Sequence, residues 1–219
     1  MSTFSATANG SSTIGYAQYG SSTWNTGSSN GACQGAYQNT SSSGSRVGVM
    51  VFSGAGAILK NKIITQIQFS ITSSAAGSGS SGKVLSFRRA NYQTLQSGIT
   101  GSAQVGAALG TLTGTFYGNT ASHTLNATTN AAFFAALKAY LIAGNSALVL
   151  YNGETSSSSG YSTNYARVTS ITMTVTYTDA TVWYRNGSTW VQCAVWYRNG
   201  STWVQCVPWY NSGGTWIRV

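Results

Sequence analysis

The sequence ITMTVTYT at residues 171–178 alternates large apolar side chains with threonine at every second position. Successive side chains of a β-strand point to opposite faces of the sheet, so the apolar residues share one face and the threonines share the other. β-branched and aromatic residues are also the types enriched in strands. The stretch therefore predicts a strand with one face on a core and the other in solvent.

Shorter runs of the same kind occur upstream, separated by loops rich in Gly, Ser and Asn. They include Phe4/Ala6/Ala8, Ile14/Tyr16, Val47/Val49/Val51 and Ile67/Phe69/Ile71, and LTGTFY at residues 112–117 also predicts a strand. Residues 73–82 (SSAAGSGSSG) predict a long surface loop within one domain, because strand patterns continue on both sides of it. These patterns indicate an all-β fold.

One helix interrupts the strands, after residue 130. Its apolar face repeats at helical spacing in Phe134, Leu137 and Leu141, and Gly144-Asn145 can end it in a left-handed turn. The candidates for its N-cap are Thr128, Thr129 and Asn130. A single amphipathic helix in a β domain is expected to close one end of the sandwich.

The strand pattern breaks at Asp179-Ala180, which divides the chain into a β-sandwich domain, residues 1–179, and a repeat tail, residues 180–219. The tail reads VWYRNGSTWVQC at 182–193, the same at 195–206, and PWYNSGGTWIRV at 208–219. Asn-Gly between short apolar runs predicts a hairpin with a type I′ turn, placed at Asn186-Gly187 and Asn199-Gly200, with Ser212-Gly213 equivalent. The tail is therefore expected to be three tandem hairpins.

A hairpin of about four residues a strand is too small to be stable alone in water. Six of the seven tryptophans lie in this tail, more than an isolated chain would leave in water. The tail is therefore expected to assemble with copies of itself or with other proteins. The predicted interface residues are Trp183, Tyr184, Trp190, Trp196, Tyr197, Trp203, Trp209, Tyr210 and Trp216. Stacking of these tryptophans on sugar rings is the alternative.

Charged residues make up 6% of the chain, and the formal net charge is +9. The excess arises from missing acids, since only Glu154 and Asp179 are acidic and the basic residues are scattered. A specific nucleic-acid partner is therefore not expected. The charge is either a solvated excess or an attraction to an acidic envelope, anionic glycan or acidic neighbouring subunit. An uncharged, hydrogen-bonding surface suits packing against copies or neighbours, because few ions must be desolvated.

The chain lacks the residues that catalysis usually requires. Glycoside hydrolysis generally uses two carboxylates that flank the glycosidic bond. Glu154 and Asp179, the only acids of the chain, do not form an evident pair in the sequence. His123 lacks a supporting nucleophile spacing and is expected to be an ordinary residue in or beside a strand. Cys33, Cys193 and Cys206 give no metal-site spacing. We expect no enzyme, no catalytic residue, no metal and no cofactor.

The N-terminal stretch MSTFS has neither a basic nor an apolar signal region, and no segment is long and apolar enough for a membrane span. The chain is thus expected to be made in a cytosol, although its composition is typical of extracellular adhesins and fibres. A virion protein reconciles the two, since it is made in the host cytoplasm and becomes extracellular after lysis.

The order of helix, buried strand at 147–151, Ser-rich loop and YSTNYARVTSITMTVTY at 161–177 resembles the closing half of DNRLRE-type β-sandwich modules. With its WYxNGxxW repeats, the chain resembles virion structural or appendage proteins of tailed phages, especially those of gut bacteria. The resemblance covers about residues 125–219, and the first 120 residues add general β-sandwich character. It implies a jelly-roll-like sandwich acting as adhesin or spacer, and it transfers no catalytic residues.

The sequence therefore predicts a phage virion structural protein, a fibre, tail-appendage or capsid-decoration subunit, acting by assembly and surface display. Its expected partners are other copies of itself in a homo-oligomer, of which a trimer is one arrangement, and other virion proteins. A carbohydrate-binding adhesin or receptor-binding module and a self-polymerising extracellular fibre are the alternatives. For a host surface glycan, the candidate contacts are Tyr16, Tyr19, Trp24, Tyr37, Tyr161 and Tyr165.

Overall fold

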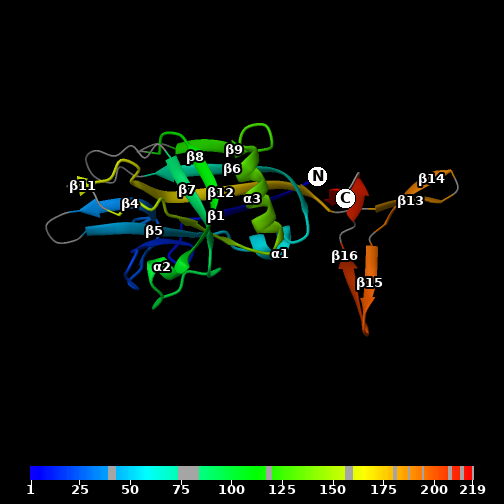
Figure 1. Ribbon diagram of the computed structural model, residues 1–219, viewed down its shortest axis with the longest axis horizontal. Helices are drawn as coiled ribbons and strands as arrows, with labels where there is room; N and C mark the ends of the chain where they lie inside the picture. The colour runs from blue at the N-terminus through cyan, green and yellow to red at the C-terminus, as the bar shows by residue number, and fades with distance from the viewer. Residues whose placement is uncertain are drawn as a thin grey trace.

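The chain folds into an all-β, jelly-roll-like sandwich followed by small hairpins, as Figure 1 shows for this computed structural model. The structure describes residues 1–38, 43–73, 84–116, 120–155, 160–179, 182–186, 188–193, 195–206, 209–212 and 215–218. The predicted loop at 73–82 lies outside these ranges except for Ser73, the last residue of a strand. Among the described residues, no helix combines the length and apolarity needed to span a bilayer.

The first layer contains β1 (Ser2–Ala8), β12 (Ala166–Thr178), β6 (Ile63–Ser73) and β9 (Thr120–Leu125) in that order, all antiparallel. The predicted alternation in β12 is confirmed, since Ile171, Met173 and Val175 are fully buried. On the outer face, the hydroxyls of Thr7 and Thr172 are 2.7 Å apart across the β1–β12 pair. Apolar packing inside and hydroxyl contacts outside together fix the strand register.

The second layer has the order β8 (Val105–Thr113), β7 (Val84–Ala90), β10 (Ala147–Leu150) and β5 (Ser43–Val51). Strand β5 also pairs with β2 (Ile14–Gln18), which pairs with β3 (Asn25–Thr26). The predicted strand at 112–117 is confirmed only for Leu112 and Thr113, because β8 begins at Val105 and ends at Thr113; Tyr117 lies outside the described residues. Gly106 and Gly110 obscured β8, since glycine weakens the strand pattern in the sequence.

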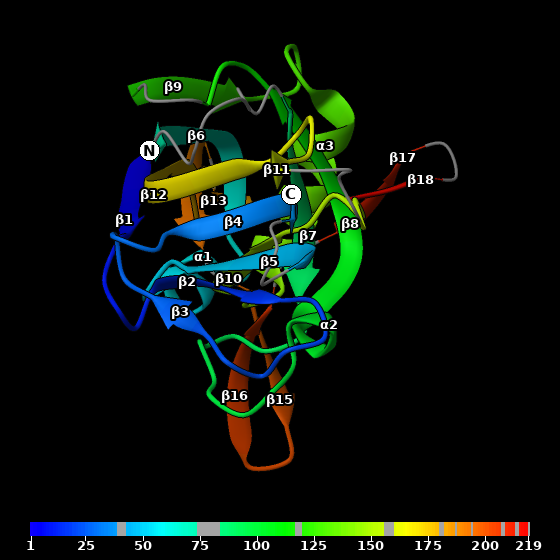
Figure 2. The same ribbon diagram turned by 90° about the vertical axis from the view of Figure 1, so that its left-hand side faces the viewer.

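Strand β4 (Ala32–Gln38) joins the two layers. Its first three residues pair with β12, whereas Gly35–Gln38 pair with the start of β5, and Gln38 and Tyr37 pair with β11 (Gly160–Tyr161). Figure 2 shows β4 lying between β12 and β5. At the crossing, a Cβ on Gly48 would lie 2.6 Å from the Cys33 nitrogen. Glycine at 48 therefore permits a backbone approach that any side chain would prevent.

The main core lies between the layers and beneath the predicted helix, which is confirmed as α3 (Ala131–Ile142). Phe134, Leu137 and Leu141 are buried as expected, and Phe133 adds a ring 5.3 Å from Phe87. Gly144 has the predicted positive φ, 97°, whereas the Asn130 side chain makes no capping hydrogen bond. In Figure 1, α3 lies at the end of the sandwich nearer the hairpins.

Two short helices were not predicted from the sequence. The first is α1 (Ala55–Leu59), which packs Ala55 and Leu59 into the main core. The second is α2 (Gly101–Gln104), whose Thr100 hydroxyl accepts a hydrogen bond from the Ala103 nitrogen at its N-cap. Both are little more than one turn long, so neither has room for the repeated apolar spacing that identifies a helix in a sequence.

The tail forms three separate two-stranded antiparallel sheets, as expected from its repeats. They are β13 (Val182–Asn186) with β14 (Thr189–Cys193), β15 (Val195–Asn199) with β16 (Thr202–Cys206), and β17 (Trp209–Ser212) with β18 (Thr215–Arg218). Figures 1 and 2 show the hairpins pointing away from the sandwich and in different directions.

The turn of the second hairpin differs from the prediction. Asn199 is paired with Thr202 and belongs to the strand, so the two central residues of the turn are Gly200 and Ser201. Gly200 has a φ of 63°, and Ser201 has no positive φ. A positive φ at the first central residue alone is the pattern of a type II′ turn, which requires glycine only there. The Asn-Gly prediction therefore placed the turn one residue too early.

Candidate functional site

The second hairpin exposes two tryptophans on one face. Arg198 is paired with Trp203, and Trp196 lies two residues before Arg198, so the register puts all three residues on the same side of the hairpin. Trp196 is 52% exposed and Trp203 is 63% exposed. Such exposure is high for the largest aromatic side chain, which proteins usually bury in large part. This face is therefore available for contact with another surface.

The first hairpin has the same register as the second, with Trp183 opposite Gln192 and Arg185 opposite Trp190. The remaining predicted interface side chains lie outside the described part of the structure, namely those of Trp183, Tyr184, Trp190, Tyr197, Trp209, Tyr210 and Trp216. No backbone ladder joins one hairpin to the next among the described strands. The repeated units are thus local structures that the rest of the described chain does not pair with.

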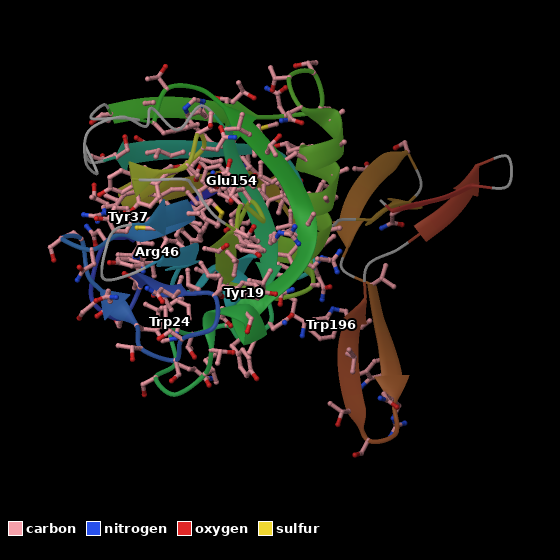
Figure 3. The ribbon with its side chains drawn as sticks, turned by 60° about the vertical axis from the view of Figure 1, so that its left-hand side comes forward. Tyr19, Trp24, Tyr37, Arg46, Glu154 and Trp196 are labelled. Atoms are coloured by element: carbon pink, nitrogen blue, oxygen red, sulfur yellow. The ribbon has the colours of Figure 1, made fainter. Side chains whose placement is uncertain are left out.

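Four of the six predicted glycan contacts gather at the far end of the sandwich, and we call Tyr16, Tyr37, Tyr161 and Tyr165 the tyrosine cluster. The rings of Tyr37 and Tyr161 are 4.6 Å apart, and those of Tyr161 and Tyr165 are 4.4 Å apart. The Arg46 guanidinium lies 5.3 Å from the Tyr16 ring centre and 5.9 Å from that of Tyr37. Figure 3 shows Tyr37 and Arg46 at one end and Trp196 on the tail.

The contacts of the tyrosine cluster are mostly internal. Tyr165 is 2% exposed and donates its hydroxyl hydrogen to the Cys33 sulfur at 3.7 Å. Burial raises the pKa of the Tyr165 phenol and that of the Cys33 thiol, so both groups are neutral at neutral pH. Because several ring faces already touch each other or Arg46, the cluster is suited to closing this end of the sandwich.

The Glu154 carboxylate lies beside the tyrosine cluster and accepts hydrogen bonds from the Ser162 hydroxyl and the Asn164 side-chain nitrogen. Asp179, the only other acid of the chain, pairs with Lys62 just beyond the opposite end of β12. The 13 residues of β12 span roughly 40 Å at about 3.3 Å per residue, with Glu154 bound near the start of this strand and Asp179 following its end. They therefore do not form a glycosidase pair, for which about 5–10 Å is needed.

Tyr19 lies on the outer face of the second layer rather than in the tyrosine cluster. Its ring stacks on that of Tyr151, with centres 5.1 Å apart, and the Arg88 guanidinium lies 5.4 Å from the Tyr151 ring centre. Tyr19 is 42% exposed, so one part of its ring remains in contact with solvent. These neighbours could not be predicted from the sequence, because Tyr151 lies more than a hundred residues from Tyr19 and Arg88 about seventy.

Trp24, the last predicted glycan contact, belongs to a second small core on this outer face. Val47, Val49 and Val51 of β5 are buried here and not in the main core, and Trp24 and Leu95 pack over them. The Trp24 ring nitrogen donates a hydrogen bond to the Ile99 carbonyl oxygen at 3.0 Å. The indole is thus fixed between the valine surface below it and the loop that precedes α2.

A cleft of about 440 Å³ opens over Trp24 and Leu95, and we call it the Trp24 cleft. Its walls come from the β1–β2 loop, the segment around β3, and the β7–α2 loop. Besides Trp24, Leu95 and Gln96, the described lining residues are Ser11, Ser12, Ser22, Thr23, Thr26 and Ser97. Within the described ranges, none of these six hydroxyls makes a side-chain hydrogen bond to the protein.

A larger cavity of about 570 Å³ lies between the end of α3 and the ends of β7 and β8. Its amide side chains serve the fold. The Gln93 oxygen accepts hydrogen bonds from the Ser146 and Ala147 nitrogens, and the Asn91 nitrogen donates to the Ala103 and Val105 carbonyl oxygens. These amides are therefore engaged in the fold, and the charged group among the described residues that line the cavity is Arg89, whose guanidinium lies 5.9 Å from the Tyr140 ring centre.

His123 lies in β9, as predicted, with its ring 5.0 Å from that of Phe116. Its Nε2 atom is buried without a hydrogen-bond partner among the described residues. Desolvation lowers the pKa of His123. No group of three or more His, Cys, Asp and Glu residues that could hold a metal ion occurs in the described part of the chain.

Comparison with known proteins gives no family for this chain. No protein-family model matches the sequence, and no curated protein is significantly similar to it.

Proposed function

We propose that the chain is a structural subunit of a phage particle, a fibre, tail-appendage or capsid-decoration protein that acts by assembly and surface display. The observation that carries the proposal is the hairpin face with Trp196 and Trp203 both more than half exposed. The hairpin tail would bury this face against copies of the chain or other virion proteins. The resemblance of residues 125–219 to tailed-phage appendage proteins supports the choice of particle.

The exposed tryptophans give the tail a strong driving force for association. A tryptophan presents about 250 Å², so the exposed fractions of Trp196 and Trp203 amount to roughly 280 Å² on one hairpin. At about 25 cal/mol per Å², covering this area would contribute up to about 7 kcal/mol before the entropy of association is subtracted.

The sandwich supports display because its two ends are separated. The tail follows β12 at one end, and Tyr37 and Arg46 lie at the other (Figure 3). A particle that held the subunit by its tail would therefore leave the far end of the sandwich free. The near absence of acids also suits a crowded assembly, because few charged groups must lose their water there.

The test of assembly is the mass of the purified full chain, measured by light scattering, for the natural protein and for a Trp196→Ser/Trp203→Ser variant. We expect the natural chain to form oligomers and the variant to have a lower mass at the same concentration. The matched control is Tyr19→Ser/Tyr92→Ser, which removes two aromatic side chains that are 42% and 37% exposed on the sandwich. An unchanged oligomer in the tryptophan variant would contradict assembly through the tail.

Two further measurements address the particle itself. Deleting residues 180–219 is expected to give monomers, and antibody labelling in electron microscopy is expected to place the full chain on intact phage particles. Filaments formed by the purified chain alone would instead favour a self-polymerising fibre. Absence of the chain from purified particles would contradict a virion role.

A further inference from the structure

We propose that the Trp24 cleft binds a neutral saccharide. The cleft combines a fixed aromatic surface with hydroxyl and amide groups from three separate segments of the chain. Its volume, about 440 Å³, falls in the range of about 300–1,000 Å³ that small-ligand sites occupy. The site is independent of assembly by the tail, because no tail residue is among its described lining residues.

The indole supplies the apolar part of recognition. Trp24 packs on the valines of β5, and its ring nitrogen is held by the Ile99 carbonyl oxygen, so the ring does not have to be ordered when a ligand binds. Leu95 extends the same surface into the cleft. A sugar ring has one face of C–H groups, which packs against an aromatic ring while its hydroxyls point to the sides.

The walls supply the polar part. Six hydroxyl-bearing residues and Gln96 surround the indole, and within the described part of the chain the six hydroxyls have no side-chain hydrogen bond to the protein. A Ser or Thr hydroxyl rotates and can both donate and accept, and an amide also does both. Sugar hydroxyls also both donate and accept hydrogen bonds, so each of them can pair with these groups as donor or as acceptor.

The absence of charge selects among saccharides. None of the nine described lining residues is ionisable, although the chain as a whole carries a net charge of +9. Recognition of a sulfated, phosphorylated or acidic sugar would place a basic group at the anion, since such bonds are stronger than neutral ones. The ligand is therefore an uncharged sugar.

The two other candidate surfaces are less suitable for this ligand. In the tyrosine cluster, Tyr16 and Tyr37 contact Arg46, and Tyr37 also contacts Tyr161. In the cavity beside α3, Gln93 and Asn91 are engaged in hydrogen bonds to the backbone. Among these three, the Trp24 cleft combines an aromatic floor with six hydroxyls that make no side-chain hydrogen bond within the described residues, although the Gln96 side-chain nitrogen donates to the Thr94 hydroxyl at 3.3 Å.

The experiment is affinity electrophoresis of the full chain in native gels that contain dextran, mannan, galactomannan or xyloglucan. Polygalacturonate serves as the anionic comparison, and all gels are repeated in about 0.5 M salt to screen the net charge. We expect at least one neutral polysaccharide to retard the chain at both salt concentrations. Trp24→Ala is expected to weaken that binding by roughly tenfold or more, as truncation of a central aromatic contact usually does.

A second variant is needed because Trp24 also packs on the outer core, so Trp24→Ala could weaken binding by unfolding the sandwich. Ser97→Trp places a bulky ring in the cleft from an exposed position, and it should abolish retardation while the thermal unfolding of the sandwich stays unchanged. Tyr19→Ala, an exposed aromatic outside the cleft, is the matched control and should bind normally. The proposal is overturned if none of the four neutral polysaccharides retards the chain, or if both cleft variants bind like the natural protein.

Discussion

Replacing Gln34 with methionine would test how the two layers of the sandwich are joined. Gln34 is fully buried in β4, at the point where this strand leaves β12 and begins to pair with β5. Its side-chain nitrogen donates to the Val84 carbonyl oxygen at 2.7 Å and to the Asn164 carbonyl oxygen at 3.0 Å. Its side-chain oxygen accepts from the Ser86 nitrogen at 2.8 Å. One amide thus satisfies three backbone groups, from β7 and from the loop before β12.

Methionine has a similar length but cannot replace these hydrogen bonds. Three partly buried backbone groups would lose these partners, and each group left unsatisfied costs about 1–3 kcal/mol. The loop at Asn164 is expected to shift so that water replaces the hydrogen bond to the Asn164 carbonyl oxygen. We therefore expect the free energy of unfolding to fall by about 3–5 kcal/mol. For a domain of this size, 1 kcal/mol corresponds to about 2–4 °C, so Tm should fall by roughly 10 °C.

The assay is chemical and thermal unfolding followed by circular dichroism, with the natural chain and the variant at the same concentration. Gln66→Met in β6 is the matched control, because Gln66 is exposed, and it should change the free energy of unfolding by less than about 0.5 kcal/mol. A Gln34→Met variant within about 1 kcal/mol of the natural chain would refute the argument that this amide joins the layers.

Two other predictions concern single titratable groups. Burial lowers the pKa of His123, so the unfolded chain binds a proton at this residue more readily than the folded chain does. The free energy of unfolding should therefore fall as the pH decreases below about 6.5. This decrease should be absent in the His123→Gln variant. His123 is the only histidine, so urea unfolding between about pH 7 and pH 5 isolates it, and equal pH dependence in both proteins would contradict its burial. Cys33 is buried and its thiol pKa is raised, so in a Cys193→Ser/Cys206→Ser background iodoacetamide should react with it only after denaturation. Rapid labelling of the folded variant would show that the thiol is accessible.

Much of the fold follows from local patterns in the sequence. The alternation of residues 171–178, the helical spacing of Phe134, Leu137 and Leu141, and the repeats of the tail each predicted an element that the structure contains. These patterns are informative because one face of each element must meet an apolar surface. Strand β8 was misplaced because its glycines remove side chains from the pattern, and α1 and α2 are too short to show a period.

The candidate sites depend on contacts between distant parts of the chain. The sequence indicated which aromatic residues could bind a sugar, but it gave no means to separate Trp24 from Tyr37 or Tyr161. Their difference is tertiary, since Arg46 and neighbouring rings contact the tyrosines, whereas an open cleft lies over Trp24.

Most of the strands, the main helix and the three hairpins follow from local sequence patterns, because each of these elements depends on residues a few positions apart. The second core of Val47, Val49 and Val51 arises from tertiary packing, as does the contact of Trp24 and Leu95 with it, although these two residues are 71 positions apart in the sequence. An alternating strand specifies two faces but not what covers each of them. The cover of the outer face comes from loops whose positions are fixed by packing and by hydrogen bonds such as that from Trp24 to Ile99.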